Sequence, residues 1–504
     1  MYPVTVSELA ALLNASVIGS GENESAARAA SVTGVSIDTR TLVPGDVFFA
    51  LPGSHCHGMA HASAAQAAGA SAIVTDSLLQ TDTGVSDSPS QMGRLQNQSQ
   101  AVPVLLVQDS AAALTQLAIW NRRQSDALII GITGSVGKTT TRQMIFSVLS
   151  SVHQGIQSPA NFNNELGVPI SLLRLTSDHE FASIEMGASG PHEIAPLAST
   201  ARPEFGVITR VSPAHLEGFG DIDTVFRTKR ELIESLPSHG VAFLNGDDAM
   251  VRRMQSSAPC PVVLFGETPD CDIRPEKVLY VEGVLSFEVH GFKYRVKASG
   301  RHLMCSALAA IAVGKQIGLS PLEIQSGLAS FHPGSGRGSI LQLPNWTVID
   351  DTYNASPASV AAAIESVSGW KSCRHQILVL GDMKELGQQS AEFHRQAGAA
   401  IAATTISHVL AFGEFANDVA AGFLESSAAA NSVPLQNRIS VFRDMHQLCE
   451  LLDCILSDGD VVLVKGSRSV GMERVVEHLR TLSFQQPRSP RTAQKSDFAD
   501  LSAA

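Results

Sequence analysis

The sequence has no uninterrupted apolar run that approaches the roughly 20 residues needed to span a bilayer. Its N-terminal stretch MYPVTVSELAALLNASV has no positively charged segment ahead of the apolar residues, unlike a secretory signal. The seven cysteines are scattered and include no C-x-x-C pair, so a disulfide framework is not indicated. We therefore expect a reduced, cytoplasmic protein without membrane insertion.

Positive charge is also scarce. Lysine and arginine number 36 against 48 aspartates and glutamates, a formal net charge of -12. A nucleic-acid-binding protein would instead concentrate positive charge on one surface. The composition favours chemistry on small molecules and argues against a nucleic-acid partner.

The length and patterning indicate three domains. At 504 residues, about 150 residues per domain gives roughly three. Short strand-like runs come first, and from about residue 126 apolar strands alternate with glycine turns and helices. A β-meander over 277–298 and the glycine-rich HPGSGRGS precede a second region of alternation.

We predict an α/β protein with a small α/β N-terminal domain, a central parallel-sheet domain of the P-loop ATPase type and a C-terminal Rossmann-like domain. The predicted limits are 1–125, 126–333 and 334–484. The polar stretch TDTGVSDSPSQMGRLQNQSQ predicts a loop, and the aperiodic residues 485–504 predict a disordered tail.

The segment GITGSVGKTTTRQM follows an apolar strand and leads into a helical pattern. The common phosphate-loop pattern would place a glycine five residues before Gly137, at Ile132, but here the glycines fall at Gly131 and Gly134. Small residues still let backbone amides and a helix N-terminus face a phosphate, while Lys138 supplies positive charge. Thr139 stands where a hydroxyl normally ligates Mg²⁺. The alternative is a plain strand-to-helix turn.

Polar residues follow two other predicted strands. Glu185 ends the strand in SIEMGAS, and His215 and Glu217 follow the strand in VITRVSPAHLEGFG. Because ligands bind at the carboxyl ends of parallel strands, these side chains could converge on Lys138. Taken alone, each is more often a cap or a surface group.

Two further groups favour structural interpretations. Lys229 lies in a charged amphipathic helix, where a solvated face with i,i+4 pairing is the simpler interpretation. HCHGMAH offers one cysteine and three histidines but no partner pair at zinc-finger spacing, so we interpret it as a loop.

These motifs together resemble the Mur ligases over nearly the whole chain to residue 480, and most closely the members that add D-alanyl-D-alanine. The ATP loop of that family resembles T-G-[ST]-x-G-K-[ST]-T, and this chain has TGSVGKTT. NFNNELGVPISLL, VSPAHLEGFG followed by TKREL, and VKGSRSVGME also resemble family segments, whereas the D-N-P-R motif of the diamino-acid-adding ligase is absent.

The resemblance implies an ATP-dependent amide ligase that requires Mg²⁺ and works through an acyl phosphate. Its substrates would be UDP-N-acetylmuramoyl-tripeptide, D-alanyl-D-alanine and ATP, and we expect a monomer. By resemblance, catalysis involves Lys138, Lys229, His215 and Glu185, with Lys229 carbamylated. The implied Mg²⁺ ligands are Thr139, Glu185, His215 and Lys229. The implied ATP-binding residues are Gly134, Ser135, Val136, Gly137, Lys138, Thr139, Thr140, Arg337 and Asp351. The implied peptide and UDP contacts are Ser36, Arg40, Asn161, Asn163 and Asn164.

The chain departs from the family pattern in places. Leu303 and Ser306 in HLMCS replace two asparagines of an H-N-x-x-N motif associated with adenine, D-G-H is replaced by HGM, and Ser356 replaces an asparagine of Y-N-A-N-P. The alternatives are a diamino-acid-adding or folylpolyglutamate synthetase-like ligase, or a paralogue that binds nucleotide or UDP-sugar without turnover.

Overall fold

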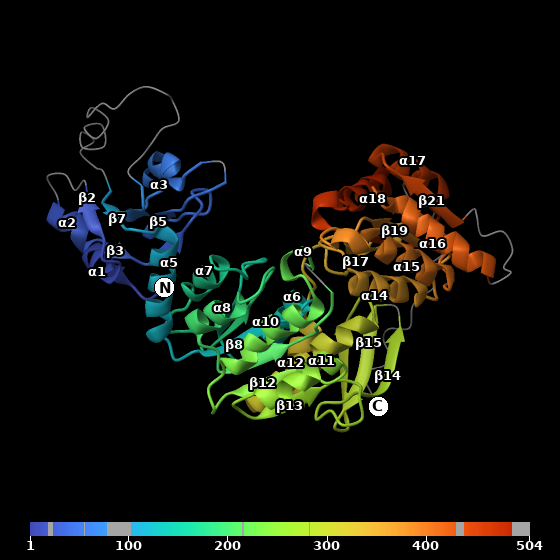
Figure 1. The fold of residues 1–504 in the computed structure, drawn as a ribbon, viewed down its shortest axis with the longest axis horizontal. Coiled ribbons are helices and arrows are strands. Elements are labelled where there is room, and N and C mark those ends of the chain that lie inside the picture. Colours follow the sequence, from blue (N-terminus) through green and yellow to red (C-terminus); the bar gives the residue numbers. More distant parts are fainter. Residues whose placement is uncertain are drawn as a thin grey trace. The chain divides into compact units, whose positions relative to one another are not determined.

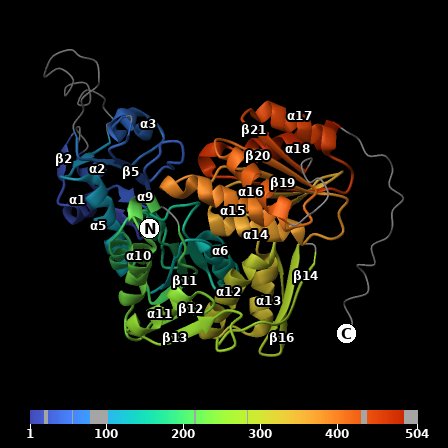
Figure 2. The ribbon, with the colours of Figure 1, turned by 45° about the vertical axis from the view of Figure 1, so that its right-hand side comes forward.

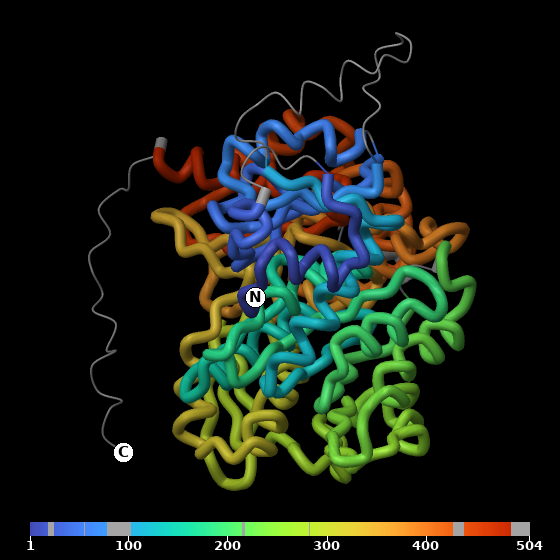
Figure 3. The backbone as a smooth tube through the Cα atoms, turned by 90° about the vertical axis from the view of Figure 1, so that its left-hand side faces the viewer, coloured from blue at the N-terminus to red at the C-terminus, as the bar shows by residue number. Residues whose placement is uncertain are grey.

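The computed structural model describes residues 1–18, 24–54, 56–77, 102–213, 216–281, 283–429 and 438–485 (Figure 1). The chain divides into two compact units, and Figure 3 follows its backbone from the N-terminus. The first unit comprises Met1–Lys277, Phe287–Arg295 and Met304–Phe331. The second comprises Val278–Ser286, Val296–Leu303 and the chain from His332 onward.

The first unit begins with a mixed five-stranded sheet in the order β2-β7-β6-β5-β4. Strands β4 to β7 are parallel, and β2 is antiparallel to β7 at one edge. Strand β5, DVFFA, is buried throughout, as expected where both faces of a sheet are covered. The bounds are β1 (Val4–Thr5), α1 (Val6–Leu12), β2 (Ser16–Ile18), α2 (Glu24–Ala29), β3 (Ser31–Val32), β4 (Gly34–Ser36), β5 (Asp46–Ala50), η1 (Gly58–His61), α3 (Ala62–Ala67), β6 (Ala72–Thr75), β7 (Val104–Leu106) and α5 (Ser110–Arg123).

The centre of the first unit is a parallel six-stranded sheet in the order β13-β12-β11-β8-β10-β9. Helix α6 packs against α12 and α13, which return to this unit from later in the sequence (Figure 2). The bounds are β8 (Leu128–Thr133), α6 (Lys138–Leu149), β9 (Gly155–Gln157), α7 (Gly167–Leu172), β10 (Phe181–Glu185), α8 (Ile194–Ala201), β11 (Phe205–Ile208), α9 (Leu216–Phe219), α10 (Ile222–Glu234), β12 (Val241–Asn245), α11 (Ala249–Arg253), η2 (Met254–Ser257), β13 (Val262–Phe265), α12 (Met304–Gln316) and α13 (Pro321–Ser330).

A continuous apolar core joins the two sheets of the first unit. Leu117 of α5 and Ile129 of β8 belong to the same buried cluster. The Asn121 amide of α5 also donates to the carbonyls of Leu172 and Leu175, at 2.9 and 3.2 Å. Helix α5 therefore anchors the N-terminal sheet to the central one.

The β-meander predicted over 277–298 is a three-stranded sheet in the order β14-β15-β16. Its strands are β14 (Glu276–Val281), β15 (Val284–Val289) and β16 (Phe292–Lys297). The short η3 (Arg301–Leu303) follows β16 and precedes α12.

The second unit contains a mixed six-stranded sheet in the order β17-β18-β22-β19-β20-β21, parallel except for β17. Its cores contain Val348 and Val379 on one side and Ile349 and Leu380 on the other. The bounds are β17 (Ser339–Gln342), β18 (Thr347–Asp351), α14 (Pro357–Ser368), β19 (Gln376–Gly381), η4 (Gly387–Gln389), α15 (Ser390–Ala402), β20 (His408–Phe412), α16 (Ala416–Ala429), β21 (Ile439–Phe442), α17 (Met445–Ile455), β22 (Val461–Lys465), η6 (Arg468–Val470) and α18 (Glu473–Gln485).

The predicted fold class is confirmed: a small mixed α/β sheet, a central parallel sheet and a C-terminal mixed sheet occur in the predicted order. The limits at 125 and 333 stay predictions. The polar loop TDTGVSDSPSQMGRLQNQSQ and the tail beyond Gln485 lie outside the described residues. Within the described stretches, no helix is both long and apolar enough to cross a membrane.

Candidate active site

The loop between β8 and α6 depends on its two glycines. Gly134 has φ +148° and Gly137 has φ +88°, a region that glycine enters without steric cost. A Cβ at Gly134 would lie 2.1 Å from Thr209 Oγ1, too close for any side chain. Gly137 caps α6, so the first amides of that helix open onto the loop. Lys138 Nζ donates to the Gly134 carbonyl at 2.8 Å, which places the ammonium over the loop.

Glu185 is the centre of a buried polar network beside this loop. It ends β10, which runs parallel to β8, and it is 2% exposed. Thr139 Oγ1 donates to Glu185 Oε2 at 2.8 Å, and Asn163 Nδ2 donates to Oε1 at 2.9 Å. The structure thus joins Thr139, Glu185 and Asn163, all of which the sequence indicated.

The oxygens of Thr139 and Glu185 fit a Mg²⁺ site. Mg²⁺ prefers oxygen ligands at about 2.1 Å in an octahedron, whose edge is then about 3.0 Å. The two oxygens are 2.8 Å apart, close to that edge. His215, the third predicted ligand, lies outside the described residues.

The interpretation of Lys229 as a solvated surface residue was wrong. This side chain is 2% exposed, and its Nζ lies 5.5 Å from the centroid of the Phe219 ring. Burial, together with the nearby charge of Lys138, lowers the pKa of Lys229 to about 7, although Glu193 and Glu231 act in the opposite direction. Near neutral pH the amine is therefore substantially uncharged.

The position of Lys229 could have been read from helical periodicity. Its neighbours on the buried face of α10 include Val225, Leu232 and Ile233. These residues stand four before and three and four after Lys229, the spacing of one helix face. The many charges elsewhere in this helix obscured that signal.

Arg142 and Ser158 are site residues that the sequence reasoning missed. Arg142 Nε lies 3.4 Å from Glu185 Oε2, and Ser158 Oγ accepts from the Glu185 amide at 3.0 Å. The available signal for Arg142 was its position three residues after Thr139, which puts both on one face of α6. No comparable pattern marked Ser158.

The other predicted substrate residues have distinct local roles. Asn164 Oδ1 accepts from the Gly167 amide at 2.9 Å at the start of α7, whereas Asn161 is exposed. Ser36 Oγ donates to the Asp38 carbonyl at 2.8 Å. Arg40, with 86% of its side chain exposed, binds the Asp38 carboxylate through Nε and Nη2, which lowers the pKa of Asp38 to about 2.

The HCHGMAH segment, which we interpreted as a loop, contains the short helix η1 over Gly58–His61, with His57 as its N-cap. His57 Nε2 lies 2.8 Å from Asp76 Oδ1, and Cys56 Sγ lies 3.8 Å from His61 Nε2. His55 is outside the described residues. In the stretches that the structure covers, no three metal-binding side chains gather in this segment or elsewhere.

The predicted nucleotide contacts of the second unit lie near one end of its sheet. Asp351 ends β18 and pairs in register with Lys465, the last residue of the parallel strand β22. Lys465 is 2% exposed, and its Nζ donates to Asp351 Oδ2 at 2.6 Å and to the Asn354 carbonyl at 2.9 Å. The Arg337 guanidinium lies 3.6 Å from the centroid of the Tyr353 ring.

The HLMCS departure has a structural role at Ser306. Its hydroxyl lies 2.9 Å from that of Thr141, and both are buried. The pair joins α12 to α6 immediately behind the phosphate loop. Ser306 therefore holds α12 against the first turn of α6.

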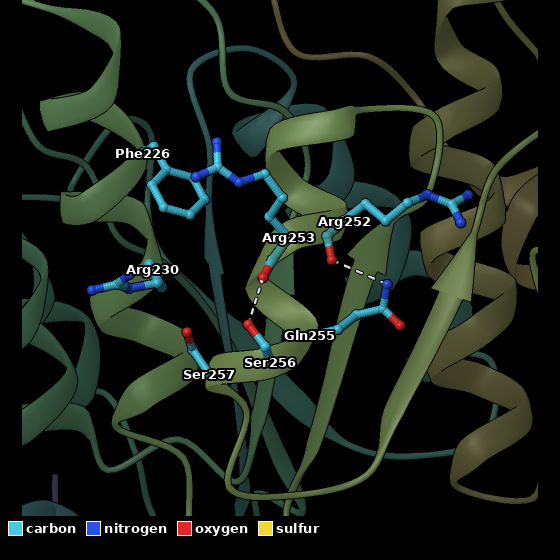
Figure 4. A pocket seen from close by; sticks show the side chains of 7 residues that line it. All are labelled: Phe226, Arg230, Arg252, Arg253, Gln255, Ser256 and Ser257. Atoms are coloured by element: carbon cyan, nitrogen blue, oxygen red, sulfur yellow. Dashed lines mark hydrogen bonds between the residues drawn. The ribbon is translucent and has the colours of Figure 1, made fainter.

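A surface hollow beside α10 contains none of the predicted site residues (Figure 4). The guanidiniums of Arg230 and Arg253 lie 5.6 and 5.0 Å from the centroid of the Phe226 ring. Arg230 also pairs with Glu234 at 2.8 Å, and Arg252 pairs with Asp270. The arginines of this hollow therefore make local packing contacts and ion pairs. These contacts do not indicate an active site in the hollow.

The chain is similar to known proteins over about 95% of its length. Residues 31–121 match the Mur ligase family catalytic domain, 132–314 the Mur ligase middle domain, and 336–468 the Mur ligase glutamate ligase domain. The UDP-N-acetylmuramoyl-tripeptide–D-alanyl-D-alanine ligase of Escherichia coli is 32% identical, covering 95% of this chain and 99% of its own. The ligase of the same name from Bacillus subtilis is 30% identical, covering 89% and 93%.

Two solved structures show the same overall likeness. A crystal structure of MurF from Acinetobacter baumannii has a TM-score of 0.80 and 26% identity, covering 95% of this chain and 99% of its own. The MurF ligase of Thermotoga maritima in complex with ADP has a TM-score of 0.75 and 26% identity, covering 90% and 99%.

Proposed function

This chain belongs to the Mur ligase family, and we propose that it joins D-alanyl-D-alanine to UDP-N-acetylmuramoyl-tripeptide with the cleavage of ATP. The observation that carries this function is the match to ligases of that name over nearly all of this chain and of theirs. The reaction is a step in the synthesis of peptidoglycan precursors, which we place in the cytoplasm because its UDP-linked substrate and ATP are found there.

The proposed reaction has two steps. The terminal carboxylate of the tripeptide attacks the γ-phosphorus of ATP, which gives an acyl phosphate and ADP. The dipeptide amine then attacks the acyl carbon and loses a proton, and phosphate leaves as the amide forms. The loop amides from Gly134 to Thr140 and the Lys138 ammonium hold the phosphates, so the protein supplies position and charge. The complex of the Thermotoga relative with ADP supports nucleotide binding.

We assign Mg²⁺ to Thr139, Glu185, His215 and a carbamylated Lys229. Bound Mg²⁺ would reduce the repulsion between the phosphates and the incoming carboxylate. The buried amine of Lys229 suits carbamylation, because only a neutral amine attacks CO₂, giving a carbamate and releasing a proton. A carbamate supplies the oxygen ligand that an ammonium lacks.

The remaining contacts follow the family resemblance. We assign γ-phosphate and ribose contacts to Arg337 and Asp351, UDP contacts to Ser36 and Arg40, and peptide contacts to the loop with Asn161, Asn163 and Asn164. We also propose the domain limits 1–125, 126–333 and 334–484, and a monomer in solution. Light scattering on the purified protein tests the monomer.

The test is product formation by the purified protein with ATP and Mg²⁺. UDP-N-acetylmuramoyl-tripeptides with either 2,6-diaminopimelate or lysine as the third residue should each be offered with D-alanyl-D-alanine. We expect phosphate release that requires both peptide substrates and a UDP-pentapeptide in the mass spectrum. Three other results would each identify an alternative. Addition of a diamino acid to the dipeptide precursor would indicate the diamino-acid-adding ligase, and addition of glutamate to a folate would indicate a folylpolyglutamate synthetase-like ligase. Binding without phosphate release would indicate a paralogue without turnover.

A further inference from the structure

Arg142 occupies a position that the reaction scheme above does not use. It stands on α6 one turn after Lys138 and is 2% exposed. A buried guanidinium is costly unless its donors are all used, so the partners of this side chain reveal what it holds. Acceptors in two parts of the site bind it.

One set of partners lies in the segment after β9. Arg142 Nη1 donates to Gln157 Oε1 at 2.6 Å and to the Ser158 carbonyl, and Nη2 donates to the Ala160 carbonyl at 3.3 Å. Three acceptors within four residues fix the path of this segment. Arg142 Nε also lies 3.4 Å from Glu185 Oε2, a longer distance than those to the segment.

The backbone shows why the segment needs to be held. Ala160 has φ +44°, in the left-handed region that residues with a Cβ rarely adopt. Arg142 binds the carbonyl of this strained residue. Directly afterwards the chain reaches Asn161 and Asn163, and Asn163 returns to bind Glu185 at 2.9 Å.

The geometry points to Arg142 as a positioning residue that couples the phosphate-loop helix to the peptide-binding segment 158–164. This inference rests on the proposed function for the identity of the peptide substrate. In its role, Arg142 sets the place of the peptide carboxylate relative to the γ-phosphate. The shorter contacts of Arg142 are those to the segment. Weakening them should therefore raise the KM for the peptide substrate more than the KM for ATP.

The test uses Arg142→Lys, which keeps a positive charge near Glu185 but cannot bind the separate acceptors that the guanidinium fork reaches. Arg122→Lys is a matched control. Arg122 is also buried in the first unit and binds the carbonyls of Ala201 and Ser125 and the carboxylate of Glu204, away from the site. The two variants lose similar contacts in different places.

Kinetics should separate the two arginines. We expect Arg142→Lys to raise the KM for the UDP-tripeptide by about ten-fold or more, as for the loss of a charge-assisted contact, with the KM for ATP within about three-fold of wild type. Arg122→Lys should change both by less than about three-fold. Equal increases in both KM values, or the same split in Arg122→Lys, would overturn the inference.

Amide hydrogen exchange on the ligand-free proteins gives a readout that does not need the reaction. Exchange over residues 157–164 should be about ten-fold faster in Arg142→Lys and unchanged in Arg122→Lys. Exchange over residues 201–205 should instead be faster in Arg122→Lys and unchanged in Arg142→Lys. Unchanged exchange over 157–164 contradicts the inference. If Arg142→Lys does not fold, Gln157→Leu removes one acceptor of the Arg142 guanidinium. This variant should also show faster exchange over residues 157–164 and a higher KM for the UDP-tripeptide. Absence of any amide product from wild type would refute the proposed function alone, because the exchange comparison still decides the role of Arg142.

Discussion

Removal of CO₂ should inactivate the enzyme reversibly, with a pH dependence set by Lys229. At the ordinary lysine pKa of 10.5, about one amine in 3,000 is neutral at pH 7. At a pKa of about 7, half of the Lys229 amines are neutral. The lowered pKa therefore increases the neutral, reactive fraction of Lys229 by roughly a thousand-fold at that pH. Because the reaction releases a proton, carbamylation should increase as the pH rises through 7.

The assay is turnover after exhaustive removal of CO₂ and bicarbonate, followed by their return at pH 6, 7 and 8. We expect loss of at least about nine-tenths of the activity and recovery that is greater at pH 8 than at pH 6. With ¹³C-bicarbonate, a carbamate resonance should appear in wild type and be missing from Lys229→Ala. That variant should be inactive and partly rescued by formate or acetate.

Two results would refute this reasoning. Full activity in CO₂-free buffer would show that the unmodified amine suffices. Activity of Lys229→Arg would show that the site needs a cation, because a guanidinium neither reacts with CO₂ under these conditions nor ligates Mg²⁺.

Lys138→Ala should keep its fold and lose more than about nine-tenths of turnover, since the lost phosphate contact should cost at least about 2 kcal/mol; phosphate release and circular dichroism check this. Gly134→Ala should abolish nucleotide binding, measured by calorimetry, because its Cβ would meet Thr209 Oγ1 at 2.1 Å. Ser306→Ala leaves the buried Thr141 hydroxyl without this partner and should lower the unfolding free energy by about 1 to 3 kcal/mol, read as a lower unfolding temperature. In CO₂-free buffer the lowered pKa of Lys229 means that the unfolded chain binds this proton more strongly, so the contribution of Lys229 to the unfolding free energy should increase between about pH 7 and 10.5. Lys229→Met should lack that pH dependence. At pH 7 its free energy of unfolding, measured by calorimetry, should exceed that of wild type by up to about 4 kcal/mol, and the difference should disappear by pH 10.5.

The strands with the clearest sequence pattern are those covered on both faces of a sheet. In the two six-stranded sheets, β10, β12, β19 and β22 are buried along their full length and read as apolar runs. The strands with a weaker apolar pattern all stand at sheet edges, have three or four residues and are only partly buried; they are β9, β13, β17 and β21. An edge strand has a neighbour on one side only, so its sequence carries a weaker apolar signal.

The same reasoning separates the site residues that could be predicted from those that could not. The position of Glu185 beside the phosphate loop follows from topology, because the carboxyl ends of adjacent parallel strands lie at the same edge of a sheet. Lys229 followed from the family resemblance, although the spacing of Val225 and Leu232 on its helix face already indicated burial.

Arg142 illustrates what local patterns leave out. Its acceptors are 15 to 43 residues away in sequence, so no local window contains the segment that it holds. The pair of Thr141 and Ser306 is separated by 165 residues. Ser306 replaces an asparagine of a motif that the family resemblance associates with adenine, and its contact with Thr141 joins α12 to the helix that begins at Lys138. A departure from a family pattern therefore has to be assigned through the partner that the side chain meets, because a polar residue near a nucleotide loop can act on the loop as well as on the nucleotide.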